Sequence, residues 1–337
     1  MLSSYLLPST SEEDTHLDTI RPVILSSRCL GFASCRYNGQ TITDDFVEKL
    51  KPYVDFITIC PEVEIGLGIP RDPIRLVLQG NEPRLLQPAT GQDVTEAMQR
   101  FCQTFLDQLD VVDGFLLKHR SPSCGPHAVR TYHSKNLGAG FEKGMGYFAH
   151  EIACRFPGFP MEEEGRLKDY TIREHFLTSL FALTDFRKVK EARSMKDLID
   201  FHSRSKLLLL AYHQSKMREM GRLLASHRKE SLEDLTREYE VLLRQALVKP
   251  PRQGSVINTF QHAFGGVSDH LSDKERIFFL NKIEEYRDER IPMSILGALL
   301  QSWALRLEKH YLLNQRFFFP YPEGLCSVRD SGKGLRK

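Results

Sequence analysis

The sequence lacks a long apolar run and a strong charge of either sign. No stretch of its 337 residues reaches the roughly 18 consecutive apolar residues of a membrane-spanning helix. Lys and Arg number 46 against 44 Asp and Glu, which leaves a formal net charge of +2. Such a balance gives no electrostatic reason to expect a nucleic-acid or membrane partner. We therefore expect no membrane association, and composition leaves the oligomeric state open.

The start of the chain also lacks the basic and apolar segments of a secretory signal. Residues 1–20 contain four acidic side chains, and we expect them to form a flexible leader rather than a signal peptide. The seven cysteines are odd in number, which argues against a disulfide framework. In a reducing compartment, cysteines are more often metal ligands or nucleophiles. We therefore predict a cytoplasmic protein.

Hydrophobic patterning divides the chain into two parts. In the first part, short apolar runs typical of buried strands alternate with helical patterns. This predicts a Rossmann-like α/β domain with a mostly parallel sheet over residues 21–160. Over residues 161–322 apolar residues recur at three- and four-residue intervals, which predicts an all-α domain, and residues 323–337 resemble a disordered tail. The predicted strands are 22–27, 56–59 and 114–118, with a hairpin over 75–79 and 84–87 and helices over 93–109 and 140–156.

Three cysteines, Cys29, Cys60 and Cys124, each follow one of the three predicted strands. In an open parallel sheet, ligands bind where loops leave the carboxyl ends of the strands. We therefore expect these thiols to meet at one edge of the sheet. Cys102 and Cys154 lie in apolar, helix-like runs and are interpreted as small core side chains. Cys326, in the polar tail, is given no role.

The spacing of the three thiols leaves the kind of site open. Structural zinc sites usually take four ligands, often from Cys-x-x-Cys pairs, and the sequence has no such pair. Three widely spaced thiolates suit an iron–sulfur cluster in which one iron lacks a protein ligand. They also suit unliganded thiols beside a catalytic cleft.

Three motif blocks span about residues 23–129. They are Ser27-Arg28-Cys29-Leu30-Gly31 with Cys35-Arg36-Tyr37-Asn38-Gly39, Cys60-Pro61-Glu62-Val63 with Gly66-Leu67 and Pro70-Arg71, and Lys118 with Ser121-Pro122-Ser123-Cys124-Gly125. Together these blocks resemble the thiouracil desulfidase family. The resemblance implies that Cys29, Cys60 and Cys124 hold a 4Fe-4S cluster whose fourth iron is free to take the sulfur of a substrate. Cys35 is interpreted as a bystander. The first block has Arg28 where the family more often has alanine.

The same resemblance suggests a reaction and its residues. The predicted activity is hydrolytic removal of sulfur from a thiocarbonyl compound such as 2-thiouracil, with release of hydrosulfide. Glu62 is the candidate base that activates water, and Ser121 and Ser123 can hydrogen-bond the substrate. Ser27 and Arg71 are candidates to contact the substrate. The predicted partner is a small thiolated base or nucleoside, or a thiolated RNA.

Two other functions stay open at this point. The sulfur flow can be reversed, so that sulfide is donated to a tRNA base. That activity predicts a nucleotide-binding loop, and no Gly-x-x-x-x-Gly-Lys motif occurs. Alternatively, the chain is a non-catalytic metal-binding interaction module, which predicts a fourth protein ligand such as Cys35 or His119.

The second part of the chain contains a further set of polar and aromatic segments. They are Phe201-His202 with Lys206 and His213, Asn258 with Gln261-His262, Glu284-Glu285-Tyr286-Arg287, Ile291-Pro292, and Tyr311-Leu312 through Gln315 to Pro320-Tyr321-Pro322. Together these segments resemble the YbgA-type helical domain, which occurs alone or fused behind a desulfidase-like domain. On a continuous helix, His202, Lys206 and His213 would share one face, either as an anion-binding stripe or as a polar surface.

Overall fold

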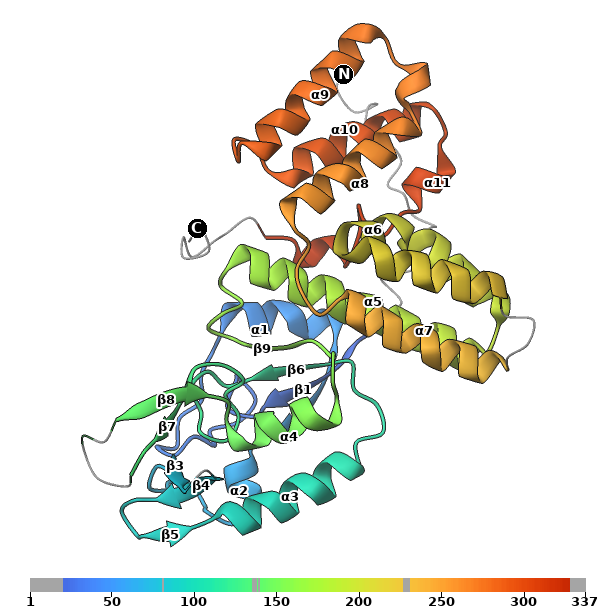
Figure 1. Ribbon diagram of the computed structural model, residues 1–337. Helices are drawn as coiled ribbons and strands as arrows, with labels where there is room; N and C mark the ends of the chain where they lie inside the picture. Colours follow the sequence, from blue (N-terminus) through green and yellow to red (C-terminus); the bar gives the residue numbers. More distant parts are fainter. Residues whose placement is uncertain (1–20, 81, 135–137, 139, 227–230, 328–337) are drawn as a thin grey trace, which may run out of the picture. The chain divides into compact units, whose positions relative to one another are not determined.

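The computed structural model describes residues 21–80, 82–134, 138, 140–226 and 231–327 (Figure 1). It forms two compact units, Met1–Thr184 with Gly324–Lys337, and Asp185–Glu323. The predicted leader and residues 328–337 of the predicted tail lie outside the described residues. The division falls later than the predicted boundary at residue 160, because strand β9 (Met161–Glu163) belongs to the sheet of the first unit.

The first unit contains a four-stranded sheet, sheet A, in the order β2-β1-β6-β9. All three neighbouring pairs are parallel, and the last four residues of β1 are buried. A parallel strand buried in this way needs cover on both faces of the sheet, which agrees with its apolar start and its small last residues, Ser26 and Ser27. The predicted parallel α/β arrangement is confirmed. The other strands of sheet A are β1 (Val23–Ser27), β2 (Asp55–Ile59) and β6 (Gly114–Leu117).

A second sheet, sheet B, has the order β5-β4-β3-β7-β8 and is mostly antiparallel. The predicted hairpin is confirmed as β3 (Arg75–Gln79) and β4 (Glu82–Gln87). The predicted helix over 140–156 is wrong at its start, where β8 (Phe141–Gly144) pairs with β7 (Val129–Tyr132). The Phe141 and Tyr132 rings contact across this pair with centroids 5.9 Å apart. The remaining strand is β5 (Gln92–Asp93).

Helices cover both faces of sheet A. Helix α1 (Asp45–Leu50) lies on one side of β1 and β6, and α4 (Tyr147–Arg155) lies on the other (Figure 1). The side chain of Asp44 caps α1 by accepting the amides of Phe46 and Val47. Helix α3 (Thr95–Asp107) contributes to the same core as α4 and the central strands. This core fixes the strand ends from which the loops emerge.

The two cysteines predicted to lie in the core, Cys102 and Cys154, differ in burial. Cys102 is 2% exposed and packs in the core between α3 and the strands, as predicted. Cys154 is exposed, and the prediction for it is wrong. Helix α4 buries the side that carries Phe148 and Ile152, and Cys154 lies off that side.

The second unit is helical throughout the part that the structure describes, and the predicted all-α domain is confirmed from α5 onward. Its core is aromatic: the rings of Phe186 and Tyr239 stack with centroids 5.2 Å apart, and those of Phe264 and Phe279 stack at 4.6 Å. Such pairs add to the free energy gained by burial. The helices are α5 (Tyr170–Ala192), which crosses the division, α6 (Met195–Ser226), α7 (Leu232–Ala246), α8 (Gln253–Gly265), α9 (Asp273–Arg287), α10 (Met293–Arg306) and α11 (His310–Leu313).

Helix α6 is not continuous. His213 has extended backbone angles, φ −159° and ψ 86°, so the prediction that it shares a helix face with His202 and Lys206 is wrong. Further along the unit, the side-chain amide of Gln315 accepts from the amide of Leu207 at 3.0 Å and donates to the carbonyl of Ser203 at 2.8 Å. An uninterrupted helix would pair those two backbone groups with each other. Gln315 therefore has a structural role in this unit.

His202 makes the helical unit sensitive to acid. Its Nδ1 lies 2.9 Å from the hydroxyl of Tyr239, and burial lowers the pKa of His202 to about 4. Between about pH 6.5 and pH 4 the unfolded chain binds a proton at this histidine and the folded chain does not. We expect the free energy of unfolding to fall by roughly 2–3 kcal/mol over that interval.

Fluorescence of Trp303, the single tryptophan, follows unfolding of this unit because the residue is buried in it. His202→Asn should flatten the pH dependence, whereas His262→Asn, at an exposed histidine of α8, should leave it unchanged. An equal slope in wild type and His202→Asn would contradict this account.

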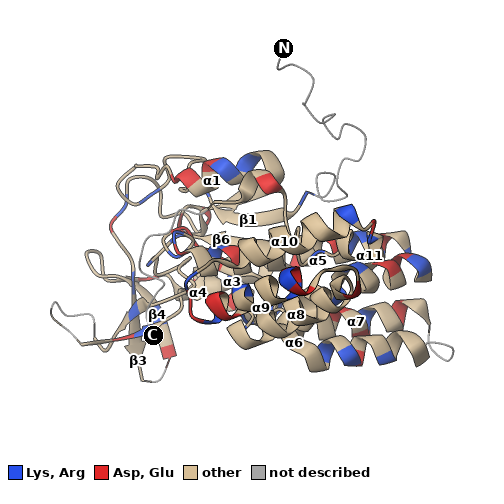
Figure 2. Ribbon diagram, turned by 90° about the horizontal axis from the view of Figure 1, so that it is seen from above, with Lys and Arg blue, Asp and Glu red and all other residues tan. Residues whose placement is uncertain are grey.

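Basic and acidic residues are interspersed along the helices rather than collected by sign (Figure 2). This agrees with the near balance of charges in the sequence. Within the described residues, no helix combines the length and the apolarity required to cross a bilayer.

Candidate active site

The three predicted ligands follow three neighbouring parallel strands of sheet A. Strand β1 lies between β2 and β6, and the loops that leave their carboxyl ends carry Cys29, Cys60 and Cys124. Neighbouring parallel strands present these ends at the same edge of the sheet. The structure brings the three side chains to one cavity, while their role as metal ligands stays a prediction.

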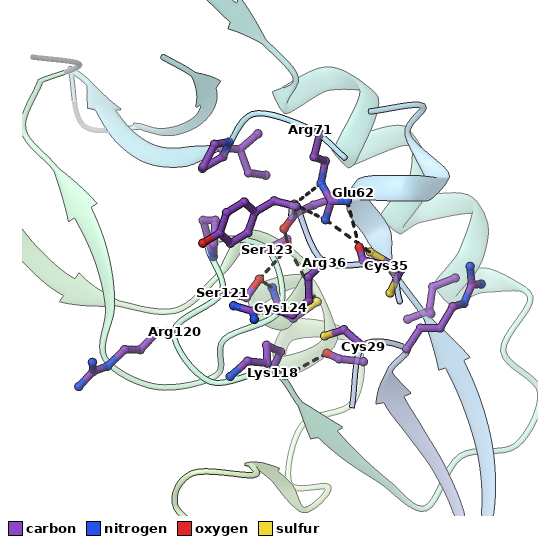
Figure 3. Close-up of a pocket in the computed structure, with 18 of the residues that line it drawn as sticks. Cys29, Cys35, Arg36, Glu62, Arg71, Lys118, Arg120, Ser121, Ser123 and Cys124 are labelled. Atoms are coloured by element: carbon purple, nitrogen blue, oxygen red, sulfur yellow. Dashed lines mark hydrogen bonds and ion pairs between the residues drawn. The ribbon is translucent and has the colours of Figure 1, made fainter. Parts of the chain in front are cut away.

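The cavity has a volume of about 370 Å³, a size typical of small-molecule sites. The labelled thiols of Cys29, Cys35 and Cys124 are gathered around the same space, whereas the Arg120 side chain points away from it (Figure 3). Every predicted site residue lines the cavity: Ser27, Cys29, Cys60, Glu62, Arg71, Ser121, Ser123 and Cys124.

Cys29, Cys35 and Cys60 pack together as a buried group of thiols. The hydrogen bond with Cys29 raises the pKa of Cys35, and the hydrogen bond with Cys35 raises the pKa of Cys60. Burial raises both pKa values further. In the metal-free protein Cys35 and Cys60 therefore hold their protons, which metal binding would displace. Cys35, the predicted bystander, lies in direct contact with two predicted ligands.

Cys124 is held from two sides by serines. Burial raises the pKa of Cys124 to about 12, and hydrogen bonds from Ser27 and Ser123 act in the opposite direction. The hydroxyl oxygen of Ser27 also accepts the amide of Lys118 at 2.9 Å. Ser27 is 2% exposed, and its observed contacts are with protein groups. Its predicted contact with the substrate stays a prediction.

A chain of hydrogen bonds connects the carboxylate of Glu62 to the two serines of the third motif. Ser123 Oγ donates to Glu62 Oε1 at 2.7 Å, and the hydroxyls of Ser123 and Ser121 lie 3.0 Å apart. Glu62 and Ser123 are buried, and Ser121 is half-buried. The carboxylate is thus placed in the cavity with a polar path beside it.

Arg71 fixes the same carboxylate from the other side. Its Nε donates to Glu62 Oε2 at 2.8 Å, and its terminal nitrogen donates to the carbonyls of Cys35 at 3.0 Å and Gly68 at 3.1 Å. A second terminal nitrogen lies 3.8 Å from Cys60 Sγ. The Arg71 side chain is 4% exposed. In the structure it therefore holds the carboxylate and the thiol segments together, and the predicted substrate contact stays untested.

Arg28, which distinguishes the first motif, lines the same cavity as the thiols. Its guanidinium pairs with the Glu64 carboxylate at 2.9 Å, and its side chain is 30% exposed. Helix α2 (Pro61–Glu64) carries Glu64 and Glu62, so one short helix contributes to both ion pairs.

The turn that carries Cys124 is locked by close backbone contacts. The amide of Cys124 donates to Ser121 Oγ at 3.0 Å. A Cβ atom at Gly125 would lie 2.9 Å from the carbonyl oxygen of Ser121, and one at Gly146 would lie 2.6 Å from the carbonyl oxygen of Ser123. Both positions require glycine because the backbone approaches so closely. The start of α4 therefore fixes the third cysteine.

Two glutamates that the sequence analysis did not single out hold the next pair of cavity residues. Glu163 Oε1 lies 2.5 Å from His119 Nδ1, and the Glu164 carboxylate pairs with the ammonium of Lys118. Strands β6 and β9 are parallel neighbours, which places the two glutamates beside Lys118 and His119. In the sequence, these two glutamates are marked by the acidic run that starts at Glu162.

The described residues include no group of three His, Cys, Asp or Glu side chains arranged to hold a single metal ion. The residues that could hold a larger cofactor are the thiols that line the cavity, Cys29, Cys35, Cys60 and Cys124. The predicted set of three cysteine ligands stays a prediction.

Comparison with known proteins matches the two parts of the chain separately. The family described as 2-thiouracil desulfurase matches residues 24–164, and a protein family of unknown function, DUF1722, matches residues 206–322.

Individual relatives each match part of the chain. The uncharacterized protein YbbK of Bacillus subtilis (strain 168) is 34% identical over 110 residues, which are 31% of this chain and 73% of that protein. The uncharacterized protein YbgA of Escherichia coli (strain K12) is 27% identical over 158 residues, 46% of this chain and 93% of that protein. Among solved structures, the 4Fe-4S-dependent thiouracil desulfidase TudS aligns with 27% identity and a TM-score of 0.36, over 44% of this chain and 93% of that one.

The parallel α/β unit, with thiols and a carboxylate gathered at its strand ends, thus carries the sequence signature of one class of protein. The chain belongs to the 2-thiouracil desulfurase family. Behind that domain it carries a YbgA-type helical domain. The predicted family and the predicted fusion are both confirmed.

Proposed function

We propose that this chain is an iron–sulfur-dependent desulfidase. It removes sulfur hydrolytically from a thiocarbonyl substrate such as 2-thiouracil and releases hydrosulfide. The observation that carries the proposal is the convergence of Cys29, Cys60 and Cys124 with the Glu62–Ser123 pair around one cavity of a desulfurase-family domain.

The donor chemistry of the cavity fits an iron–sulfur cluster. Thiolates are the usual ligands of such clusters, and Cys29, Cys60 and Cys124 reach the cavity from three separate loops. A cubane carries its ligands on different irons, so these thiols need not converge on one point as the ligands of zinc must. When bound with three protein ligands, the cluster would supply a soft Lewis acid for the sulfur of the substrate.

The residues of the chain would handle water and its proton. Glu62 takes a proton from water as the water oxygen adds to the thiocarbonyl carbon. Oε2 of Glu62 is contacted at 2.8 Å by both Nε and a terminal nitrogen of Arg71. Oε1 accepts from Ser123 and keeps a further lone pair for water. Arg71 and Ser123 thus orient the base. Overall, C=S and water give C=O, hydrosulfide and a proton, with no net electron transfer.

The experiment is an anaerobic reconstitution followed by incubation with 2-thiouracil. We expect hydrosulfide and uracil in equal amounts from the loaded protein and neither from the metal-free protein. A loaded protein that releases no hydrosulfide from any thiolated base or nucleoside would overturn the proposal. Consumption of sulfide in the presence of tRNA, without release from thiouracil, would contradict it in favour of sulfur transfer.

A further inference from the structure

We propose that His119 is a second proton-transferring residue of this site and that Glu163 positions it. In this role His119 donates the proton with which the sulfur of the substrate leaves as hydrosulfide. The inference rests on the proposed function and gives His119 a role in catalysis rather than that of a fourth metal ligand.

The geometry of the His119–Glu163 pair is that of a histidine oriented by a buried carboxylate. Glu163 Oε1 lies 2.5 Å from His119 Nδ1, and the Glu163 side chain is 1% exposed against 31% for His119. Within the described residues, the second oxygen of Glu163 has no hydrogen-bond partner. The carboxylate is therefore committed to the imidazole. A carboxylate on Nδ1 fixes the ring orientation and leaves Nε2 as the atom that exchanges protons.

The ring is held in place by its surroundings and open to the cavity. The His119 amide donates to Glu164 Oε2 at 2.8 Å. The ring also packs on Gly165, where a Cβ atom would lie 3.3 Å from its Cγ. His119 lines the cavity that contains Cys29, Cys60 and Cys124. No hydrogen bond joins its Nε2 to another side chain in the part of the chain that the structure describes.

Lys118, the other cation at this edge, does not compete for the role. Its ammonium pairs with the Glu164 carboxylate and donates to the carbonyl of His119 at 3.2 Å. The Lys118 ammonium is thus committed to protein groups, whereas Nε2 of His119 has no side-chain partner in the described part of the chain.

Charged side chains of the neighbouring residues surround the His119–Glu163 pair. Glu164 and Lys118 form one ion pair beside His119. The preceding residue, Glu162, pairs with Arg166 at 2.9 Å and lies 3.4 Å from the ring of His127. Burial raises the pKa of Glu163, and the rings of His119 and His127 act in the opposite direction.

The proton balance requires a group besides Glu62. When water adds, Glu62 takes one proton and the electron pair of the C=S bond moves onto sulfur. His119 in its protonated form then gives its proton to that sulfur. The C–S bond breaks with its electron pair on sulfur, which leaves as hydrosulfide. The oxygen forms the C=O bond, and its proton passes to the now neutral His119. Glu62 returns its proton to solvent, so the residues end as they began.

The test compares His119→Asn, His119→Ala and Glu163→Gln with His150→Asn, at an exposed histidine of α4. We expect His119→Asn to lower kcat for 2-thiouracil by about 10²-fold or more with unchanged iron and sulfide content, as for loss of a general acid. Added imidazole should partly restore the activity of His119→Ala.

Glu163→Gln should shift the alkaline limb of the pH profile of kcat to lower pH by about one unit, because the imidazolium loses its anionic partner. His150→Asn should match wild type.

A readout on the metal-free protein is independent of activity. Nitrogen NMR of the imidazole should show the proton on Nδ1 of His119 in wild type and a loss of this preference in Glu163→Gln. If wild type is active and His119→Asn stays within about threefold of it, the inference is overturned while the proposed function stands. Loss of iron in His119→Asn would overturn it in favour of a ligand role. A loaded but inactive wild type would overturn both.

Discussion

Cys29→Ser, Cys60→Ser and Cys124→Ser are each expected to abolish retention of the iron–sulfur cluster. A serine oxygen is a hard donor that replaces a soft thiolate, and loss of one of three ligands should lower cluster occupancy at least 10-fold, since even outer-shell changes at metal sites cost 10–100-fold. The measurement is iron and acid-labile sulfide per chain after anaerobic reconstitution and desalting. Sulfide release from 2-thiouracil should fall in parallel.

The controls for these variants are cysteines of the same unit that lie outside the cavity. Cys154→Ser, at an exposed position, and Cys102→Ser, in the core, should keep wild-type iron content. Cys35→Ser separates two interpretations of the thiol that contacts Cys29 and Cys60. Retained iron agrees with its being a bystander, and lost iron would contradict the three-ligand account.

Glu62→Gln is expected to lower kcat by about 10²–10⁴-fold, the range for removal of a general base. Glutamine keeps the shape of the side chain and can still accept from Ser123, so the loss would come from the missing negative charge. The measurement is the rate of hydrosulfide release at saturating 2-thiouracil, normalised to iron content. Ser123→Ala should lower the same rate by a smaller factor.

Glu64→Gln is the matched control, because Glu64 lies on the same short helix and pairs with Arg28 rather than Arg71. It should stay near the wild-type rate. Since Glu62→Gln leaves the buried guanidinium of Arg71 without its partner, thermal unfolding of both variants has to be compared. A folded, iron-loaded Glu62→Gln protein with wild-type kcat would exclude Glu62 as the base.

Local sequence patterns were sufficient to predict the strand ends that carry the site. The apolar runs before Cys29, Cys60 and Cys124 are short and end at a small or polar residue, so their strand character is visible in the sequence. Parallel pairing of those strands then requires that their carboxyl ends meet. The hairpin of β3 and β4 was equally visible from its turn residues.

The features that the sequence did not reveal depend on contacts between distant segments. Glu163 meets His119 only because β9 pairs with β6. Helix α6 is broken at His213, although the side-chain spacing suits a continuous helix. Cys154 lies off the buried side of α4, which its apolar neighbours in the sequence do not indicate. In each case tertiary context decides the outcome, and periodicity reports only local preference.

The central claim is that the first unit holds a cluster in which one iron has no protein ligand. The most direct measurement is the Mössbauer spectrum of protein reconstituted with iron-57, with and without 2-thiouracil. The account predicts one iron of the four distinct from the rest, with its signal shifted when 2-thiouracil is added. A spectrum with four equivalent irons that does not respond to 2-thiouracil, or a protein that takes up only zinc, would contradict it.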